Sequence, residues 1–130
     1  MRAAPGWLPP LSLVAESDGA VVGHVVGTRG AVDGVPAVGL GPLSVHPGAQ
    51  RRGIGSLLVH AVLAAAEARD EILVALLGEP AFYGRLGFEA AADHGIEAPD
   101  PAWGRFFQVR LLGGPAPRGR FTYAEPFDRL

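Results

Sequence analysis

The chain contains no cysteine, no lysine and no asparagine among its 130 residues. Without cysteine it can form no disulfide and offers no thiol nucleophile, so any acyl group that it transfers must pass directly to the acceptor. The absence of lysine excludes a nucleoside-triphosphate P-loop, which ends in Gly-Lys-Ser/Thr. Long apolar runs are missing too: the longest, residues 72–77, is far too short to cross a bilayer.

Charge is also sparse, at 18% of the residues with a formal net charge of −2, which gives the chain no overall attraction to nucleic acid. Hydrophobic residues make up 48%, which fits one compact domain over residues 1–130. The amino terminus lacks the apolar segment of a signal peptide. We therefore expect a soluble, cytoplasmic, single-domain protein with neither nucleic acid nor a membrane as partner.

Apolar periodicity and turn residues predict strands at 11–16, 20–28, 37–45, 71–77, 105–112 and 120–127, and helices at 54–70 and 80–86. The first two strands are expected to form a hairpin, and the last two to close the far side of the sheet. The segment 37–77 reads as a strand–helix–strand unit of the α/β class, with Pro42 predicting a bulge. The helix stripe expected to face the sheet consists of Ile54, Leu57, Leu58, Ala61, Val62 and Ala65. Residues 91–103 form a long connection that is either a binding loop or surface slack.

Residues 50–56 follow the strand that ends at Val45 and open the long helix. The first turn of a helix leaves N–H groups without partners and carries about half a positive charge. Gly53 and Gly55 allow a ligand to approach those groups closely, and Arg51 and Arg52 add permanent charge. The segment therefore predicts a seat for an anionic group such as a pyrophosphate. Leu58 stands where a dinucleotide fingerprint needs its third glycine, which excludes that motif.

The Gln/Arg-x-x-Gly-x-Gly/Ala pattern at 50–55 resembles the coenzyme A pyrophosphate loop of the GNAT superfamily of N-acetyltransferases. A second segment, residues 82–88 (FYGRLGF), looks like the Tyr-x-x-x-Gly-Phe motif that follows the fifth strand in that superfamily. The resemblance covers about residues 11–112. It is strongest to the small bacterial branch of the superfamily, whose members carry Gly-Pro-Leu-x-Val-His-Pro before the loop, as residues 41–47 (GPLSVHP) do here. It implies the GNAT fold, a mixed and mostly antiparallel sheet with a central βαβ unit and splayed fourth and fifth strands.

By this resemblance the chain is an acetyl-CoA-dependent N-acetyltransferase that acts on a primary amine of a small molecule or protein, with acetyl-CoA as co-substrate and no metal. Tyr83 takes the place of the general acid that serves the leaving sulfur. The implied cofactor-binding residues are Leu43, Ser44, Val45, Gln50, Arg51, Arg52, Gly53, Ile54, Gly55 and Ser56. The alternative function is a non-catalytic coenzyme A-binding module used for sensing or interaction.

The general base and the amino terminus depart from the family pattern. Residues 37–45 contain no carboxylate, so the base stays open among His24, His46, Glu16, Glu79, Asp93 and Glu97. The asparagine that many members carry before the tyrosine is missing. Only about ten residues precede Leu11, so the domain is expected to lack the usual first strand and helices. The uncovered hairpin that would result predicts a homodimer.

Overall fold

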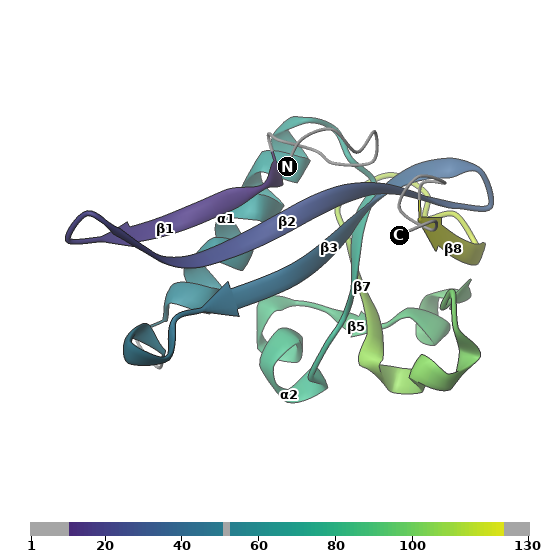
Figure 1. The fold of residues 1–130 in the computed structure, drawn as a ribbon. Coiled ribbons are helices and arrows are strands. Elements are labelled where there is room, and N and C mark those ends of the chain that lie inside the picture. Colours follow the sequence, from purple (N-terminus) through teal and green to yellow (C-terminus); the bar gives the residue numbers. More distant parts are fainter. Residues whose placement is uncertain (1–10, 51–52, 124–130) are drawn as a thin grey trace.

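The structure, a computed structural model, describes residues 11–50 and 53–123 (Figure 1). Its helices are α1 (Ile54–Ala68) and α2 (Pro80–Tyr83), with 3₁₀ turns η2 (Pro47–Ala49), η3 (Gly84–Leu86), η4 (Ala91–His94) and η5 (Pro101–Phe106). Its strands are β1 (Leu13–Ser17), β2 (Ala20–Val32), β3 (Val35–Val45), β4 (Leu73–Leu77), β5 (Glu89–Ala90), β6 (Ile96–Glu97), β7 (Phe107–Leu111) and β8 (Gly119–Tyr123). Within these ranges, no helix combines the length and the apolar character that crossing a membrane requires.

The strands form one sheet in the order β5-β7-β4-β3-β2-β8-β6, and β1 pairs with β2. The β3–β4 and β6–β8 pairs are parallel, whereas the others are antiparallel. Strand β3, helix α1 and strand β4 therefore make the expected βαβ unit at the centre of a mostly antiparallel sheet. Figure 1 shows β1, β2 and β3 running together as a long twisted ribbon.

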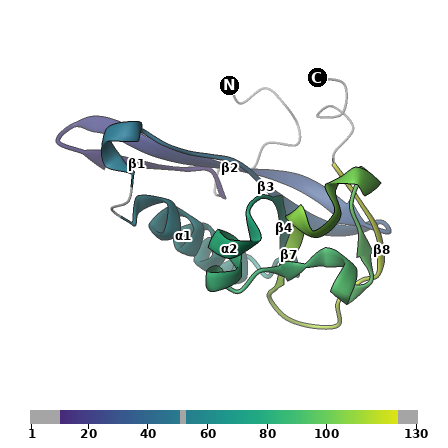
Figure 2. The same ribbon diagram turned by 90° about the horizontal axis from the view of Figure 1, so that it is seen from below.

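Both faces of the sheet are covered at β4. Figure 2 shows α1 and α2 on one side of the sheet. Val74 and Leu76 belong to the apolar cluster on the α1 side, and Leu73 and Ala75 belong to a second cluster formed with residues 91–107 and Phe121. The continuous apolar run at 72–77 is explained by this double burial, because a strand covered on both faces needs no polar alternation.

The second hairpin is tighter than predicted. Strand β2 continues to Val32 and β3 begins at Val35, so Asp33 and Gly34 alone make the turn, whereas the predicted strands at 20–28 and 37–45 left a longer connection. Both turn residues have positive φ, 48° and 82°, which is the geometry of a two-residue Asp-Gly hairpin. The Asp-Gly pair therefore marks the turn, and Gly30 and Val32 before it belong to β2.

The predicted apolar stripe of α1 was rotated by about one residue. The helix buries Leu58, Val59, Val62, Leu63 and Ala66. In contrast, Leu57 is 65% exposed and Ala61 is also on the solvent side. Residues 57–66 are apolar on nearly every side of the helix, so two neighbouring stripes have the same 3.6-residue period and periodicity alone could not choose between them.

The prediction that the last two strands together close the far side of the sheet was wrong. Strand β7 lies between β4 and β5, whereas β8 pairs with Gly30–Val32 on the far side of β2. The ring of Phe121 packs directly against the backbone of Gly30, where even a Cβ atom would lie 2.4 Å from the ring. This close contact fixes β8 against β2. Residues 124–127 of the predicted last strand lie outside the described residues.

Candidate active site

Strands β3 and β4 separate halfway along β3. Their last paired residues are Leu40 and Leu76. Just beyond Leu40, Gly41 and Pro42 of β3 together oppose Val26 of β2, which is a β-bulge. Gly41 has φ = 143°, a conformation that favours glycine. The bulge expected from Pro42 is therefore confirmed, and it turns the remainder of β3 away from β4.

Past the bulge, alternate residues of β3 direct their main-chain groups to opposite sides. The N–H of His46 donates to the carbonyl of Val22, and His24 lies opposite Ser44. By the alternation of an antiparallel pair, the main-chain groups of Ser44 then also face β2, and those of Leu43 and Val45 face away from it. The carbonyl of Val45 indeed accepts a bond from Gln50 Nε2 at 3.1 Å. Leu43 and Val45 thus present backbone donors and acceptors to the gap.

Helix α1 begins beside this gap with its N–H groups unpartnered within the helix. Gly53 is the N-cap in the left-handed conformation, with φ = 78°, and provides no side-chain cap. The first intrahelical bond runs from the N–H of Leu57 to the carbonyl of Gly53, at 2.9 Å. The N–H groups of Ile54, Gly55 and Ser56 precede it, and the first turn has no acidic side chain. The helix end is therefore electropositive and open to an anion.

A cavity of about 510 Å³ lies between the end of β3, the start of α1 and helix α2. A Cβ atom on Gly55 would lie 3.6 Å from Phe82 and 3.8 Å from Leu43 and Val45, all of which line the cavity. The lining residues are Leu43, Val45, Gln50, Gly53, Ile54, Gly55, Ser56, Glu79, Phe82, Tyr83 and Arg85. The cavity thus joins the backbone groups of the splayed strand to the electropositive helix end.

Tyr83 is held in the wall of this cavity. Its ring makes edge-to-face contacts with Phe82 and Phe88, with centroids 4.8 and 5.7 Å apart. Its N–H donates to the carbonyl of Glu79 at 3.0 Å, and its carbonyl accepts from the N–H of Phe88 at 3.1 Å. Burial raises the pKa of the Tyr83 hydroxyl above its ordinary value of 10.0. The hydroxyl is therefore a proton-bearing group throughout the neutral pH range.

The cavity brings together eight of the predicted site residues: Leu43, Val45, Gln50, Gly53, Ile54, Gly55, Ser56 and Tyr83. Ser44 is not among them, because its side chain lines a smaller cavity of about 290 Å³ together with His24 and His46. Arg51 and Arg52 lie outside the described residues. Phe82 and Arg85 also line the cavity, although they are not among the predicted site residues. Their position beside Tyr83 in the same motif is the signal that could have identified them.

Of the candidate general bases, Glu79 lines the cavity beside Tyr83, whereas His24 and His46 do not. His46 Nδ1 accepts a bond from the N–H of Gly48 at 3.0 Å, which leaves the proton of the neutral ring on Nε2. Neither His46 nor His24 lines the larger cavity beside Tyr83. Glu79 does line it, and its carboxylate lies at the N-terminus of α2, 3.5 Å from the N–H of Ala81. Glu79 is thus the carboxylate that the described structure brings to Tyr83.

Two of the carboxylates in the long connection, residues 91–103, already have partners within the protein. Asp100 caps η5 through the N–H of Ala102 at 2.9 Å, and Glu97 pairs with Arg120 at 3.3 Å. A cavity of about 580 Å³ in this region is lined chiefly by small and apolar residues together with Arg118, Arg120 and Glu97. Over residues 11–50 and 53–123, no three His, Asp or Glu side chains cluster as metal ligands would.

A protein-family model and a curated relative each match more than half of this chain. The family model of the acetyltransferase (GNAT) domain matches residues 10–90. The chain is 35% identical over 126 residues to the uncharacterized N-acetyltransferase YhbS of Escherichia coli K12, covering 92% of this chain and 75% of that protein.

Two solved structures extend the comparison to the fold. The crystal structure of YhbS from E. coli in complex with CoA is similar with a TM-score of 0.84 at 34% identity, covering 91% of this chain and 69% of that one. A GNAT family acetyltransferase from Brucella melitensis in complex with acetyl-CoA gives a TM-score of 0.73 at 34% identity, covering 90% and 68%.

Proposed function

The chain belongs to the GNAT family of N-acetyltransferases and uses acetyl-CoA, and we propose that its 510 Å³ cavity is where the acetyl group passes directly to a primary amine of a small molecule or a protein. The observation that carries this proposal is the convergence on one cavity of eight of the eleven residues predicted as cofactor-binding or catalytic. They come from three separate elements, so their meeting depends on the fold.

In this proposal the pyrophosphate of acetyl-CoA lies at the start of α1. The N–H groups of Ile54, Gly55 and Ser56 donate to its oxygens, and the helix dipole adds to the attraction. Arg85 also lines the cavity and supplies a permanent positive charge. The pantetheine arm then runs along β3, where the main-chain groups of Val45 and Leu43 bond to it as an added strand would.

The transfer breaks one bond and forms another. The neutral amine nitrogen attacks the thioester carbonyl carbon and forms the C–N bond, while a backbone N–H of Leu43 or Val45 polarises the carbonyl oxygen. When the tetrahedral intermediate collapses, the C–S bond breaks and its electron pair goes to sulfur. The nitrogen loses one proton and coenzyme A leaves as the thiol after gaining one. Most of the acceleration comes from holding the two reactants together.

Tyr83 serves the leaving sulfur. The ordinary pKa of a tyrosine, near 10, exceeds that of a thiol near 8.5, so full proton transfer is uphill by about 2 kcal/mol in water. Burial raises the pKa of Tyr83 further and makes transfer less favourable still. Tyr83 therefore acts chiefly by donating a strong hydrogen bond to the developing thiolate.

Glu79 gives the acceptor side of the cavity a negative charge. Its exposed carboxylate lies four residues before Tyr83, and both residues line the cavity. An amine arrives mostly as its ammonium form at neutral pH, and a carboxylate attracts that form and can accept its proton, directly or through water. The proposal thus places the anionic donor near Arg85 and the cationic acceptor near Glu79.

Replacement of Tyr83 tests the proposal. We expect Tyr83→Phe to lower kcat at least tenfold, because the hydrogen bond to the thiolate forms as the C–S bond breaks, and to leave KM for acetyl-CoA within about twofold. Thiol release from acetyl-CoA with a panel of amines measures both. Tyr123→Phe, which removes the chain's other tyrosine hydroxyl, is the matched control and should retain kcat. An unchanged kcat of Tyr83→Phe across pH would exclude this role of the hydroxyl.

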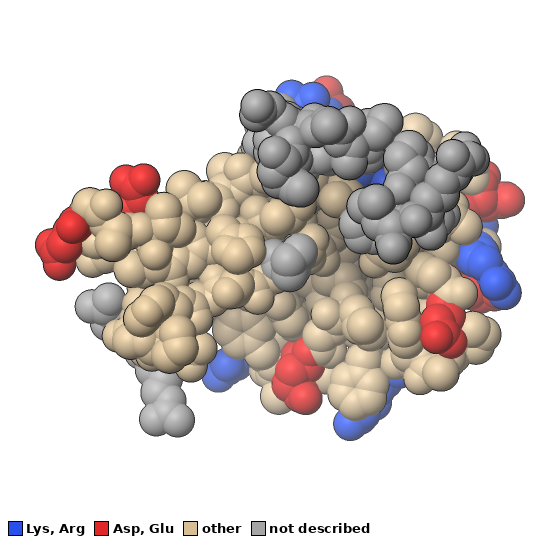
Figure 3. Space-filling view, viewed as in Figure 1, with Lys and Arg blue, Asp and Glu red and all other residues tan. Residues whose placement is uncertain are grey.

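The homodimer also belongs to the proposal. In support, within the described residues β1 pairs only with β2, and Val14 on β1 and Val21 on β2 are 59% and 56% exposed. Figure 3 shows that Asp, Glu and Arg side chains lie mainly around the rim of one broad face, which suits contact with a second copy. A single monomeric species in sedimentation at micromolar concentration would oppose it. The cytoplasmic location stays a prediction that cell fractionation would test.

A further inference from the structure

Gly78, the residue that follows β4, lies directly beneath the ring of Tyr83. A Cβ atom at position 78 would lie 2.3 Å from Cε2, 2.8 Å from Cδ2 and 3.4 Å from Cζ of that ring. No side chain other than hydrogen fits there while the ring keeps its place. The backbone of Gly78 does not itself need glycine, because its φ lies outside the left-handed range. The glycine is thus required by the tyrosine, not by the turn.

Gly78 is held in turn by a buried amide. Gln108 on β7 is only 1% exposed, and its Nε2 donates to the carbonyl of Gly78 at 3.0 Å and to the carbonyl of Phe106 at 3.3 Å. The N–H of Gly78 donates to the same Phe106 carbonyl at 2.9 Å. Gly78 is therefore bonded through both its N–H and its carbonyl to β7 and the residue before it. Since an unsatisfied buried polar group is costly, this arrangement resists displacement.

These contacts complete a support around Tyr83. Phe82 and Phe88 limit the ring at its sides, and Gly78 forms the floor on which it rests. We propose that Gly78 and Gln108 are positioning residues that fix the Tyr83 hydroxyl at the reacting sulfur, Gly78 by direct contact with the ring and Gln108 by holding Gly78. The inference rests on the proposed function of Tyr83. It also explains what a buried glutamine does at the edge of the active site.

Gly78→Ala tests the ring contact without any assay of activity. The added methyl group conflicts with the present position of the ring, so we expect the ring to move toward solvent and the pKa of Tyr83 to fall toward its ordinary value of 10.0. The titration is followed by phenolate absorbance. The chain has two tyrosines, so subtracting the curve of Tyr83→Phe isolates this one. The two charged groups that line the same cavity, Glu79 and Arg85, are unchanged in the variant.

Gly30→Ala is the matched control. Its Cβ would lie 2.4 Å from the ring of Phe121, a clash of the same size between a glycine and an aromatic ring, but at the β2–β8 contact. We expect the two variants to lose comparable stability, whereas only Gly78→Ala shifts the Tyr83 titration. A Tyr83 midpoint that is the same in Gly78→Ala and Gly30→Ala would overturn the proposal.

A double-mutant cycle tests the catalytic consequence. We expect Gly78→Ala to lower kcat roughly tenfold, since small misplacements of a reacting group are costly, but to change kcat less than twofold in the Tyr83→Phe background. Equal factors in both backgrounds would show that Gly78 acts through something other than Tyr83. If Tyr83→Phe alone leaves kcat unchanged, the proposed function of the tyrosine fails, while the titration still decides whether Gly78 positions the ring.

Gln108→Met keeps the proposal testable should Gly78→Ala fail to fold. It preserves the size of the buried side chain and removes both amide bonds, so the floor loosens without a clash. We expect a smaller loss of kcat, about threefold, that again disappears in the Tyr83→Phe background. Retention of wild-type kcat together with an unchanged Tyr83 midpoint would remove Gln108 from the proposal.

Discussion

The two halves of β3 behave oppositely, although they belong to one continuous strand. From Ala37 to Leu40 every residue is buried, and the strand pairs with β2 on one side and, over Val38–Leu40, with β4 on the other. From Leu43 to Val45 it pairs with β2 alone and its other edge faces the cavity. One half is a core strand, and the other presents an open edge to the cavity in which we propose that acetyl-CoA binds.

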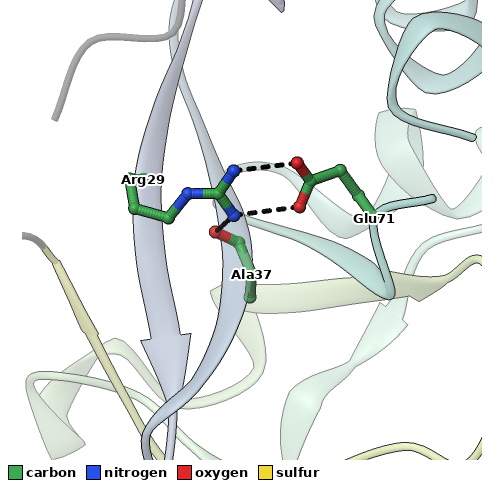
Figure 4. A network of polar contacts seen from close by, with 3 residues as sticks. All are labelled: Arg29, Ala37 and Glu71. Atoms are coloured by element: carbon green, nitrogen blue, oxygen red, sulfur yellow. Dashed lines mark hydrogen bonds and ion pairs between the residues drawn. The ribbon is translucent and has the colours of Figure 1, made fainter. Parts of the chain in front are cut away.

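An ion pair braces the closed half. Arg29 on β2 makes a two-point contact with Glu71, at 2.9 and 2.8 Å, and its Nη1 also donates to the carbonyl of Ala37 at 3.0 Å (Figure 4). The hydrogen bond with Glu71 raises the pKa of Arg29 above its ordinary value. The pair ties the residues just before β4 across β3 to β2. Strand β4 is thereby anchored at its beginning, where the sheet is closed.

The difference between the halves shows how a strand itself contributes an open edge to the cavity. At the bulge of Gly41 and Pro42 the strand gives up its pairing with β4, and the main-chain groups of Leu43 and Val45 become available. Because the closed half is buried and paired with β2 and β4, we expect those groups to keep their positions relative to α1 and Tyr83. A preorganised edge binds a ligand without an ordering cost.

The largest expected effect is on the closed half. Glu71→Ala leaves Arg29 without its partner, where Glu71 is 10% and Arg29 32% exposed, and should cost about 2–3 kcal/mol of unfolding free energy. Urea unfolding measures the loss. The control Glu97→Ala breaks the exposed pair with Arg120, 67% and 55% exposed, and should cost no more than about 0.5 kcal/mol. Equal losses of unfolding free energy in the two variants would mean that the Arg29–Glu71 pair stabilises the fold no more than the exposed Arg120–Glu97 pair does.

The next effect belongs to the open half. Gly55→Phe places a phenyl ring in the space between the start of α1, Phe82 and Leu43. Because the ring occupies space that coenzyme A would use, we expect the Kd for coenzyme A to rise at least tenfold, about 1.4 kcal/mol. Phenylalanine favours helix over glycine by about 0.4 kcal/mol, and urea unfolding of the ligand-free variant separates any overpacking of the fold from the loss of binding. Thermal shift with coenzyme A reports it, since ligand at a hundred times Kd stabilises by about 2.7 kcal/mol.

His60→Phe is the control for that variant. It places the same ring on the exposed side of the same helix, away from the cavity, and should leave the coenzyme A shift unchanged. If Gly55→Phe bound coenzyme A as tightly as His60→Phe does, the ligand would not occupy this space and the open half of β3 would lose its assigned role.

A third comparison uses two glycines of the same geometry. Gly53 and Gly34 have φ of 78° and 82°, and neither has a heavy atom within 4 Å of its Cβ position. Alanine at either site should cost roughly 1 kcal/mol of stability through strain alone. Only Gly53→Ala should also weaken coenzyme A binding, about threefold, because it disturbs the first turn of α1. Equal coenzyme A affinities in the two variants, measured by calorimetry, would contradict the proposed pyrophosphate seat.

The contrast between the halves also shows what the sequence could reveal. Pro42 predicted the bulge because proline cannot donate to a ladder, and Gly53, Gly55 and Tyr83 predicted the cavity through local motifs. These signals act within a few residues of the chain. Two residues of the predicted α1 stripe, Leu57 and Ala61, and the position of β8 were wrong because each depended on distant surfaces. Sequence periodicity fits several registers of an apolar helix, and only the sheet beneath selects one.

The support of Tyr83 could not be predicted for the same reason. Gln108 is 30 residues from Gly78, and nothing local marks a lone glutamine in an apolar strand as a partner of that carbonyl. Arg29 and Glu71, 42 residues apart, are a similar case. Paired polar groups of this kind are visible in the sequence only as isolated exceptions, and the fold alone shows which of them meet.

The smallest expected effect is a loss of stability at alkaline pH that comes from the open half alone. Burial raises the pKa of Tyr83, so between the ordinary value near 10 and its folded value the unfolded chain has lost this proton while the native protein keeps it. The unfolded state then binds fewer protons, and stability falls as pH rises; below about pH 9 both states are protonated and the effect vanishes. The raised pKa of Arg29 acts in the same direction, but only at a pH more alkaline than the range in which Tyr83 titrates. Urea unfolding at pH 8 to 11 should show a decline in unfolding free energy that Tyr83→Phe abolishes and Tyr123→Phe retains. A decline that survives in Tyr83→Phe would place the titrating group elsewhere, and the hydroxyl would then be better solvated than its contacts with Phe82, Phe88 and Gly78 imply.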